Sequence, residues 1–332
     1  MNRNFIHEAT PLDAKLPRLG LGCAAIGNLY AAVSDAEARD TLAAAVAGGI
    51  GYFDTSPYYG HGLSETRLGA FLAAAPPGLL VSSKVGRGLA AGEAAGDTGF
   101  VDAALSRPYF DYSHDGVRAQ IGDSLTRLQR ERLDIALVHD IGALTHGADH
   151  PRRLREALDG AFPALAALKA QGVVGAIGIG VNEVAVCLET LAATDIDIIL
   201  LAGRYTLLEQ TALDDLLPLC LTRRVRVVIG GPYNSGVLAG GDHYDYGAVP
   251  VAVRSRVAAL AAVCARFGVP LAAAALQFPL AHPAVASVIP GARSVAEITA
   301  TLAWLAWPIP AALWTALRRE GLLHPGAPVP AG

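Results

Sequence analysis

Four residues whose side chains can transfer protons lie near the ends of apolar, strand-like segments. Asp54, Lys84 and His139 each end such a segment, and Tyr59 follows Asp54 by five positions. A tyrosine has a pKa of about 10, and burial raises it, so Tyr59 needs a neighbouring cation to act near neutral pH. Lys84 is the candidate cation, with Asp54 as its counter-charge, and His139 would orient a substrate oxygen or relay its proton. We therefore expect a proton-transfer site in which Lys84 lowers the pKa of Tyr59.

Each of these residues also has a simpler interpretation when taken alone. Asp54 could cap the following loop, and Tyr59 could pack beside Gly60 in a turn. A single lysine at a strand end is usually an exposed charge, and a single histidine there is usually half-buried. Because titratable residues end three different strands, a shared site is favoured over three unrelated features.

The segments that would position these residues alternate between strand-like and helix-like patterns. Eight apolar runs read as strands, at 16–23, 51–55, 78–86, 132–140, 172–180, 195–202, 225–231 and 285–291. Such runs are typical of parallel sheets covered by helices, and eight of them predict a closed (β/α)₈ TIM barrel. A doubly wound open sheet is the alternative. We expect one domain over residues 1–332, with a long loop at about 87–113 and a C-terminal tail at about 308–332.

Composition excludes several classes of protein. Hydrophobic residues make up 52% of the 332 positions and charged residues 17%, which supports a large core. The net charge of -4 argues against nucleic-acid or anionic membrane partners. The four cysteines are dispersed without metal-ligand spacing, so we expect no metal site and a reducing, cytoplasmic location. The segment "MNRNFIHEATPLDAK" has no apolar signal core. A monomer or small homo-oligomer is expected.

The combined motifs resemble the aldo-keto reductase superfamily from about Pro17 to Leu302. They are "GYFDTSPYYGHGLSETRLG", "VSSKV", "LDIALVHD", "AIGIGVN" and "VIPGARS". The resemblance implies that Asp54, Tyr59, Lys84 and His139 form the catalytic tetrad. It also implies hydride transfer to or from a nicotinamide dinucleotide, NAD or NADP, bound at the barrel mouth.

Two longer stretches resemble aldose 1-dehydrogenases and the related pyridoxal 4-dehydrogenases. They are "FDYSHDGV…SLTRL…RLDIALVHDIG" and "AFPALAALKAQGVVGAIGIGVNE". The resemblance implies oxidation of the anomeric hydroxyl of an aldose, of L-fucose, D-arabinose or L-galactose type, to a lactone. Tyr59, His139 and Asp140 would contact this sugar, because a carboxylate beside the catalytic histidine favours a hydroxylated substrate. Oxidation of pyridoxal is the alternative, and a non-redox barrel enzyme or a non-catalytic binding barrel is more remote.

The resemblance also implies a set of cofactor contacts. "GLGCAAIG" lacks the Gly-x-Gly-x-x-Gly spacing of a Rossmann fold, so it would instead bring backbone close to the cofactor. "GGPYNSG" would cradle the pyrophosphate or form a simple turn. The expected contacts are Gly22, Cys23, Asp54, Asn182, Gly231, Pro232, Asn234, Ser235, Gly236, Pro290, Gly291, Ala292, Arg293 and Glu297.

Two departures from the family pattern affect the cofactor. Glu297 lies where members that use NADP usually have a basic residue, which leaves mainly Arg293 as a cation. A carboxylate suits a free ribose hydroxyl and repels a phosphate, so NAD is expected over NADP. The tyrosine that often stacks on the nicotinamide is replaced near Gly230, and Tyr205 or Tyr233 would compensate.

Overall fold

The computed structural model describes residues 16–94 and 98–331. Eight parallel strands form one sheet in the order β1-β2-β3-β6-β7-β8-β9-β12. Parallel bridges between Leu19 and Val288, and between Gly22 and Gly291, join the first strand to the last and close the barrel. The strands are β1 (Leu21–Gly22), β2 (Tyr52–Asp54), β3 (Leu80–Val85), β6 (Leu133–His139), β7 (Val174–Val181), β8 (Ile198–Ala202), β9 (Arg226–Gly230) and β12 (Val285–Ile289). The predicted (β/α)₈ barrel is confirmed, and the open doubly wound sheet is wrong.

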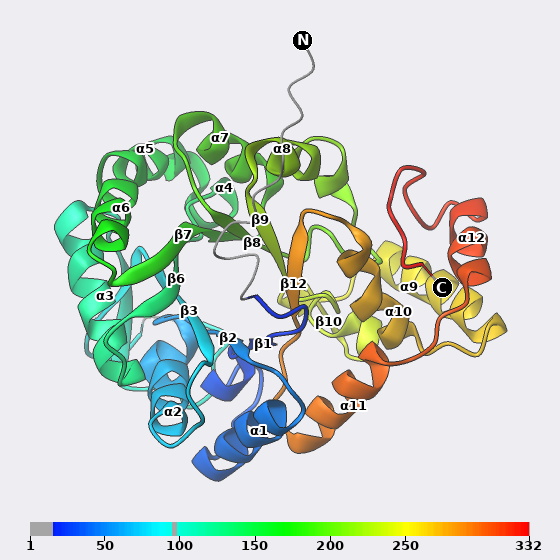
Figure 1. The fold of residues 1–332 in the computed structure, drawn as a ribbon, viewed down its shortest axis with the longest axis horizontal. Coiled ribbons are helices and arrows are strands. Elements are labelled where there is room, and N and C mark those ends of the chain that lie inside the picture. The colour runs from blue at the N-terminus through cyan, green and yellow to red at the C-terminus, as the bar shows by residue number, and fades with distance from the viewer. Residues whose placement is uncertain (1–15, 95–97, 332) are drawn as a thin grey trace.

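Helices surround the strands as an outer ring (Figure 1). They are α1 (Asp35–Ala47), α2 (Leu63–Leu72), α3 (His114–Leu128), α5 (His150–Glu156), α6 (Phe162–Ala170), α7 (Val184–Ala193), α8 (Leu216–Arg223), α9 (Val251–Arg266), α10 (Leu271–Gln277) and α11 (Val295–Leu305). A short α4 (Ala143–His146) follows β6 at the barrel mouth. Within the described ranges no single helix is long and apolar enough to cross a membrane; α9 and the segment Leu271–Ala281 reach that length only as a pair bent by 100°.

Local sequence signals explain where several helices begin and which face they bury. Ser34 and Glu37 form a reciprocal capping box that starts α1. Val117, Ile121 and Leu128 are buried on one stripe of α3, as their spacing predicts. A π-helical turn, Ala157–Ala161, separates α5 from α6. Pro163, two residues after this turn, lacks the N–H that a regular helix would use there.

The segments predicted as a loop and a tail contain regular structure. Within 87–113, β4 (Arg87–Ala91) pairs antiparallel with β5 (Ser106–Phe110), so this segment is a hairpin whose residues 95–97 lie outside the described ranges. Within 308–332, α12 (Ala311–Arg319) buries Leu313, Trp314 and Leu317 against the barrel. These apolar side chains recur at helical spacing, which is why this part of the chain folds. The N-terminal segment 1–15 lies outside the described residues.

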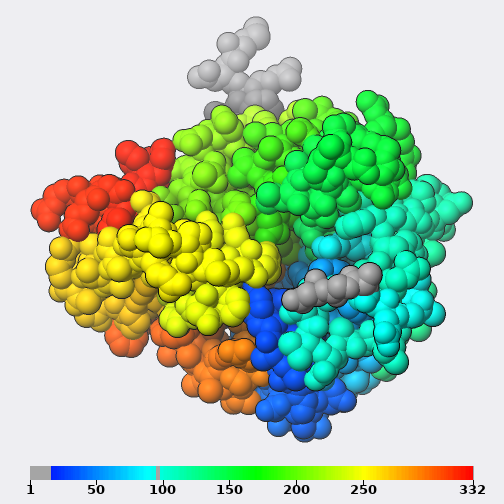
Figure 2. All heavy atoms as spheres, turned by 180° about the vertical axis from the view of Figure 1, so that it is seen from behind, coloured from blue at the N-terminus to red at the C-terminus, as the bar shows by residue number. Residues whose placement is uncertain are grey.

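A second hairpin follows β9. It consists of η6 (Val237–Ala239) and the antiparallel pair β10 (His243–Tyr244) and β11 (Gly247–Ala248). In Figure 2 the cyan segment that contains β4 and β5 and the yellow segment near residue 250 lie on opposite sides of the centre of one face. Residues of both hairpins line the same cavity, so the two hairpins form the walls of the barrel mouth.

Candidate active site

Asp54, Lys84 and Tyr59 form a continuous hydrogen-bonded chain at the carboxyl ends of β2 and β3. The Lys84 ammonium donates to Asp54 Oδ2 at 2.7 Å, to the Thr55 carbonyl at 2.8 Å and to the Tyr59 hydroxyl at 3.1 Å. These three bonds use all three ammonium hydrogens, so the charge is held in one orientation. Lys84 and Asp54 are both buried, at 2% exposure. The predicted arrangement of these three residues is therefore present.

The register of β2 against β3 supports the Asp54 carboxylate. Asp54 lies opposite Ser82, whose hydroxyl donates to Asp54 Oδ1 at 2.7 Å. The Tyr52 hydroxyl in turn lies 2.9 Å from Ser82 Oγ. Both carboxylate oxygens thus have a buried partner, one an ammonium and one a hydroxyl. This pairing is what allows a charged carboxylate to remain inside the barrel.

The expectation that Lys84 makes the Tyr59 phenol acidic is wrong for the protein without ligands. Burial raises the pKa of Tyr59 well above its ordinary value, and the negative charges of Asp54 and Asp140 raise it further. The ammonium beside the phenol belongs to an ion pair with Asp54, and the carboxylate of that pair acts in the opposite sense. Tyr59 is therefore a neutral phenol at pH 7, suited to donate a proton.

His139 ends β6 and faces Tyr59 across the cavity, with the two ring centroids 6.1 Å apart. Burial and the charges of Lys84 and Arg87 lower the pKa of His139 well below its ordinary value, so the imidazole is neutral. Ser56 Oγ lies 3.2 Å from Nδ1 and accepts a bond from the Tyr58 N–H. Nε2 lies 3.5 Å from Asp140 Oδ2, an acceptor. These contacts favour the tautomer with the hydrogen on Nε2, which faces the cavity.

Asp140 and Arg87 form an ion pair on the wall beside His139. Arg87 Nη1 donates to Asp140 Oδ2 at 2.6 Å, and the Arg87 guanidinium lies 3.6 Å from the centre of the Tyr58 ring. Burial raises the pKa of Asp140, while the Arg87 charge opposes that rise. Sequence reasoning identified Asp140 but missed Arg87 and Tyr58. Arg87 lies three positions after Lys84, which is the one sequence feature that suggests a place in the site. The turn that directs its side chain into the cavity depends on packing between residues distant in sequence.

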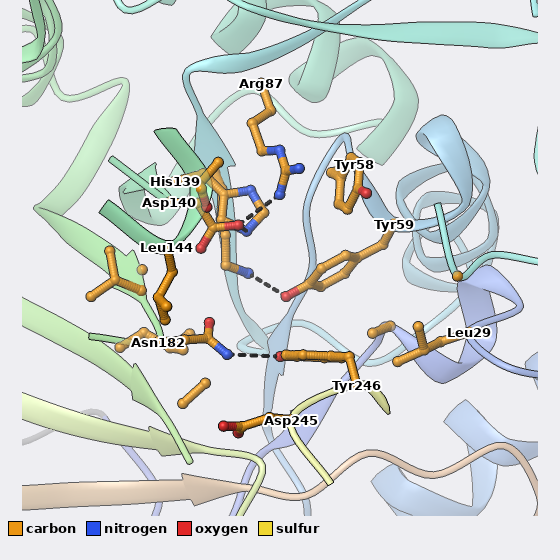
Figure 3. A pocket seen from close by; sticks show the side chains of 18 of the residues that line it. Leu29, Tyr58, Tyr59, Arg87, His139, Asp140, Leu144, Asn182, Asp245 and Tyr246 are labelled. Carbon is orange, nitrogen blue, oxygen red and sulfur yellow. Dashed lines mark hydrogen bonds and ion pairs between the residues drawn. The ribbon is translucent and has the colours of Figure 1, made fainter. Parts of the chain in front are cut away.

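These side chains share one cavity of about 480 Å³ at the barrel mouth. Figure 3 shows Tyr59, His139, Asp140 and Arg87 on one side of it and Asn182 with Tyr246 on the other. Asn182 Nδ2 donates to the Tyr246 hydroxyl at 3.3 Å. Tyr246 comes from the turn between β10 and β11 and was not predicted as a site residue. No local sequence feature indicates that this hairpin reaches across the barrel mouth, so Tyr246 could not be identified from the sequence.

The predicted cofactor residues after β9 lie in a turn that contains two glycines with positive φ angles. Gly231 and Gly236 have φ angles of 53° and 102°, which favour glycine, and a Cβ at Gly231 would meet open space. Pro232 lies between Gly231 and Tyr233 in that turn. The Ser235 hydroxyl accepts the Tyr246 N–H at 3.1 Å.

Other predicted cofactor residues have side chains that the fold already uses. Asn234 is buried, with its amide bonded to Thr206 and the Gly203 carbonyl, so it supports the loop. Cys23 is also buried, and its backbone N–H donates to the Asp54 carbonyl.

Residues after β12 form the opposite side of the predicted cofactor region. Gly22 pairs with Gly291 where the barrel closes, Pro290 accepts the Gly22 N–H at 2.9 Å, and Ala292 is buried. Arg293 and Glu297 are half-exposed and bind each other, with Arg293 Nε 3.1 Å from Glu297 Oε1. The Arg293 N–H donates to the same carboxylate at 2.9 Å.

Neither tyrosine expected to stack on the nicotinamide lines the cavity. Tyr205 is fully buried between Phe278 and His282, with ring centroids 5.4 and 5.5 Å away. Tyr233 packs edge-on against Trp304 at 5.8 Å. The aromatic side chains that do line the cavity are Tyr30, Tyr58, Tyr59, Phe100 and Tyr246.

Comparisons with known proteins give consistent results. A model of the Aldo/keto reductase family matches residues 18–319. The chain is 42% identical over 322 residues to a protein named pyridoxal 4-dehydrogenase from Microbacterium luteolum, covering 92% of this chain and 94% of the relative. It is 40% identical over 323 residues to a protein named D-threo-aldose 1-dehydrogenase from a Pseudomonas species, covering 93% and 95%. Among solved structures, an aldo-keto reductase from Bacillus halodurans in its holo form has a TM-score of 0.68 at 25% identity, covering 92% of each chain.

Proposed function

This chain belongs to the aldo-keto reductase family, and on that premise we propose that it oxidises the anomeric hydroxyl of an aldose to a lactone, using NAD or NADP. Members of this family are oxidoreductases that use nicotinamide nucleotides. The observation that carries the proposal is the buried chain from Asp54 through Lys84 to the Tyr59 hydroxyl, with His139 across the same cavity. Nearly full-length similarity to an aldose 1-dehydrogenase supports it.

The roles of the residues follow from their contacts. The Tyr59 phenol first gives its proton to solvent, and the Lys84 ammonium stabilises the resulting phenolate by its hydrogen bond. A sugar hydroxyl placed between Tyr59 and His139 then loses its proton to that phenolate oxygen. The neutral His139 donates a hydrogen bond from Nε2 to the reacting oxygen and so orients it. Asp54 keeps the Lys84 ammonium in place by the 2.7 Å contact. A bound nicotinamide dinucleotide supplies the hydride acceptor.

The residues at the mouth suit such a dinucleotide. The Asn182 amide lines the cavity and offers both a donor and an acceptor, which matches a carboxamide group. The open space at Gly231 and the left-handed turn at Gly236 leave room for a diphosphate against backbone. Arg293 is a half-exposed cation beyond β12. A carboxamide that takes over the hydrogen bond between Asn182 and Tyr246 would release the β10–β11 hairpin from this contact.

We propose NAD as the preferred nucleotide. The charge of Arg293, the expected cation for a 2′-phosphate, is paired with Glu297 through Nε, and the Arg293 backbone N–H holds the same carboxylate in place. An additional phosphate near this carboxylate would be repelled, whereas a free ribose hydroxyl could donate to it.

Pyridoxal is the second candidate substrate. The specific observation that favours it is the 42% identity to a protein named pyridoxal 4-dehydrogenase. Aldoses and pyridoxal share one chemical feature, an aldehyde that closes onto an internal hydroxyl to form a cyclic hemiacetal. The same site chemistry, removal of a hydride and a proton from that carbon and its hydroxyl, converts either hemiacetal to a lactone.

A substrate panel tests the proposal. L-Fucose, D-arabinose, L-galactose and pyridoxal would each be offered with NAD and with NADP, and formation of reduced nucleotide would be followed by its absorbance. We expect turnover of at least one aldose, and a higher kcat/KM with NAD than with NADP. Turnover of pyridoxal alone would move the assignment to the second candidate. Failure of all four substrates with both nucleotides would refute the proposed function.

A further inference from the structure

The ion pair between Arg87 and Asp140 is not part of the proton-transfer chain, and it faces the cavity. Both side chains line the pocket and are mostly buried, at 15% and 18% exposure. Arg87 uses Nη1 on Asp140, while its buried Nε has no hydrogen-bond partner within the described part of the chain. Nε is closed to solvent, so a molecule in the cavity would be bound through the Nη groups of the guanidinium. Figure 3 shows the pair beside His139, with Tyr58 on the other side of the Arg87 guanidinium.

The backbone on both sides is shaped to present this pair. Gly86 has a φ of 97°, and a Cβ there would clash with the Tyr112 ring, so the turn that aims Arg87 at the mouth requires glycine. Asp140 has a φ of 46°, an uncommon conformation for a residue with a side chain. Its N–H donates to the Gly180 carbonyl at 3.0 Å, and Tyr112 donates to the preceding carbonyl at 2.8 Å. The turn at Gly86 and the backbone conformation of Asp140 therefore both position the ion pair between Arg87 and Asp140.

The pair is also rigid on its outer side. The Arg87 guanidinium stacks on Tyr58 at 3.6 Å and lies 5.3 Å from the Phe110 ring. Stacking of this kind fixes the plane of the guanidinium, so its remaining N–H groups have set directions. A fixed donor plane beside a fixed carboxylate is suited to recognising two polar groups on adjacent atoms.

We infer that Arg87 and Asp140 bind a vicinal diol of the substrate, next to the carbon that is oxidised. Of two adjacent hydroxyl groups, one accepts a hydrogen bond from the Arg87 guanidinium and the other donates to the Asp140 carboxylate. Asp140 Oδ2 lies 3.5 Å from His139 Nε2, so the diol is held beside the group that orients the reacting oxygen. The inference rests on the proposed function and narrows it to aldoses with free hydroxyl groups at C2 and C3.

The same pair disfavours pyridoxal. Next to its aldehyde carbon pyridoxal carries a phenol, which ionises readily, and it has no vicinal diol. A phenolate there would be attracted by Arg87 but repelled by Asp140, and no hydroxyl would donate to the carboxylate. The pair is thus a specificity device that distinguishes the two candidate substrates.

The test compares D-arabinose with 2-deoxy-D-ribose, which is the same sugar without its C2 hydroxyl. For each, kcat and KM are measured with NAD and NADP, and binding to the protein without nucleotide is measured by calorimetry. The variants are Asp140→Asn, since asparagine adopts the left-handed conformation readily, and Arg87→Lys, which keeps the charge but loses the planar fork. Asp40→Asn and Arg39→Lys are matched controls on an exposed ion pair.

We expect the unmodified protein to prefer D-arabinose over the deoxy sugar by about 10- to 100-fold in kcat/KM, mainly through KM, the range for hydrogen bonds to a charged group. Asp140→Asn and Arg87→Lys should each reduce this preference at least fivefold, and the controls should leave it unchanged. Circular dichroism and thermal unfolding confirm that each variant folds.

Two different results would overturn the inference, and they can be told apart. If D-arabinose is a substrate but both folded variants keep the full preference, the pair does not bind the diol, while the proposed function stands. If the unmodified protein neither oxidises nor binds any aldose or pyridoxal, both the proposed function and the diol-binding role fail.

Discussion

At the scale of single residues, the site combines a neutral phenol with a neutral imidazole around one buried ammonium. Burial opposes charge on both Tyr59 and His139, raising the pKa of the first and lowering the pKa of the second. The protein therefore holds both reacting groups uncharged at neutral pH. In that state Tyr59 is prepared to give a proton, as reduction requires, and has to lose one before it can accept one, as oxidation requires.

This state predicts the pH dependence of the two directions. Because the pKa of Tyr59 lies above its ordinary value, the fraction of phenolate increases with pH throughout the range 7–10. The rate of oxidation should therefore increase across that range, while the rate of the reverse reduction stays level near neutral pH. Steady-state rates in both directions between pH 6 and 10 test this. An oxidation rate that is independent of pH from 7 to 9.5 would contradict it.

Tyr59→Phe removes the proton carrier and leaves the ring in place. Proton transfer contributes about 10²–10⁴-fold to such rates, so kcat should decrease by at least about 10² in both directions. Nucleotide binding, followed by fluorescence, should change less than threefold because the phenol hydroxyl is the only group removed. Near-normal turnover by this variant would exclude Tyr59 from proton transfer.

The sequence predicted which residues lie together where strand ends position them, and their catalytic roles stay a prediction. Asp54, Lys84 and His139 each follow an apolar run, and the carboxyl ends of parallel strands meet at one barrel face. The pKa of Tyr59 could not be obtained in this way, because it depends on how completely the ring is buried and on Asp140 across the cavity. Arg87 was missed because its direction is set by the packing of Gly86 against Tyr112.

At the scale of elements, two hairpins decide what reaches the barrel mouth. The β4–β5 hairpin carries Arg87 and Phe110 on one side. Contacts that hold the β10–β11 hairpin on the other side include a double hydrogen bond of 3.0 and 3.0 Å between Arg204 and Asp245, the stacking of Tyr30 on His243 at 4.4 Å, and the bond between Tyr246 and Asn182.

Weakening the β10–β11 hairpin should therefore speed nucleotide entry. Arg204→Ala removes the pair with Asp245, and a partly exposed pair contributes up to about 1 kcal/mol. If the hairpin has to shift to admit the nucleotide, its shifted population increases about fivefold, and the association rate constant for NAD increases by up to the same factor. Stopped-flow fluorescence of binding measures this, with Arg39→Ala as the control on an exposed pair. Equal association rates in the two variants would show that this hairpin does not limit entry.

Both hairpins illustrate which elements local sequence cannot indicate. Their strands have two to five residues, too few for a reliable alternating pattern, and their partners lie up to 23 positions away, as for Arg87 and Phe110. The barrel strands have strong local signals and were predicted close to their observed positions. The capping box at Ser34 is a local signal of the same kind for the start of α1.

At the scale of the whole molecule, closure of the barrel brings the two ends of the cofactor region together. The Gly22 N–H donates to the Pro290 carbonyl at 2.9 Å, and Gly22 also pairs with Gly291. A Cβ at Gly22 would lie 3.2 Å from the Ile289 carbonyl, so glycine permits this close approach. Eight repeated strand patterns predicted the barrel, because eight βα units are the number that a TIM barrel contains. The residues that join the first strand to the last could be located only once the pairing register of these two strands was known.

Buried histidines spread over the molecule link its stability to pH. The pKa values of His61, His139 and His282 are lowered chiefly by burial, and that of His146 is lowered to about 4 by burial and by the charges of Arg153 and Arg87. In the unfolded chain a histidine has a pKa of about 6.5. Between these values the unfolded state binds more protons than the folded state, so the free energy of unfolding decreases as pH falls below about 6.5.

His146 allows this linkage to be measured outside the proton-transfer chain. Because the Tyr112 hydroxyl donates its one hydrogen to the His139 carbonyl, it accepts the bond from His146 Nε2 at 2.9 Å, and the amide NH₂ of glutamine can donate in the same way. The upper limit is about 1.4 kcal/mol per pH unit for one histidine, and solvent screening of this half-buried side chain reduces it. His146→Gln should therefore retain about 1 kcal/mol more of its stability than the unmodified protein between pH 6.5 and 4.5. Urea unfolding at pH 7.5, 6.5, 5.5 and 4.5 gives the comparison, with His114→Gln on the surface as the control. Identical pH dependence in His146→Gln and the unmodified protein would show that His146 takes up its proton equally in the folded and unfolded states.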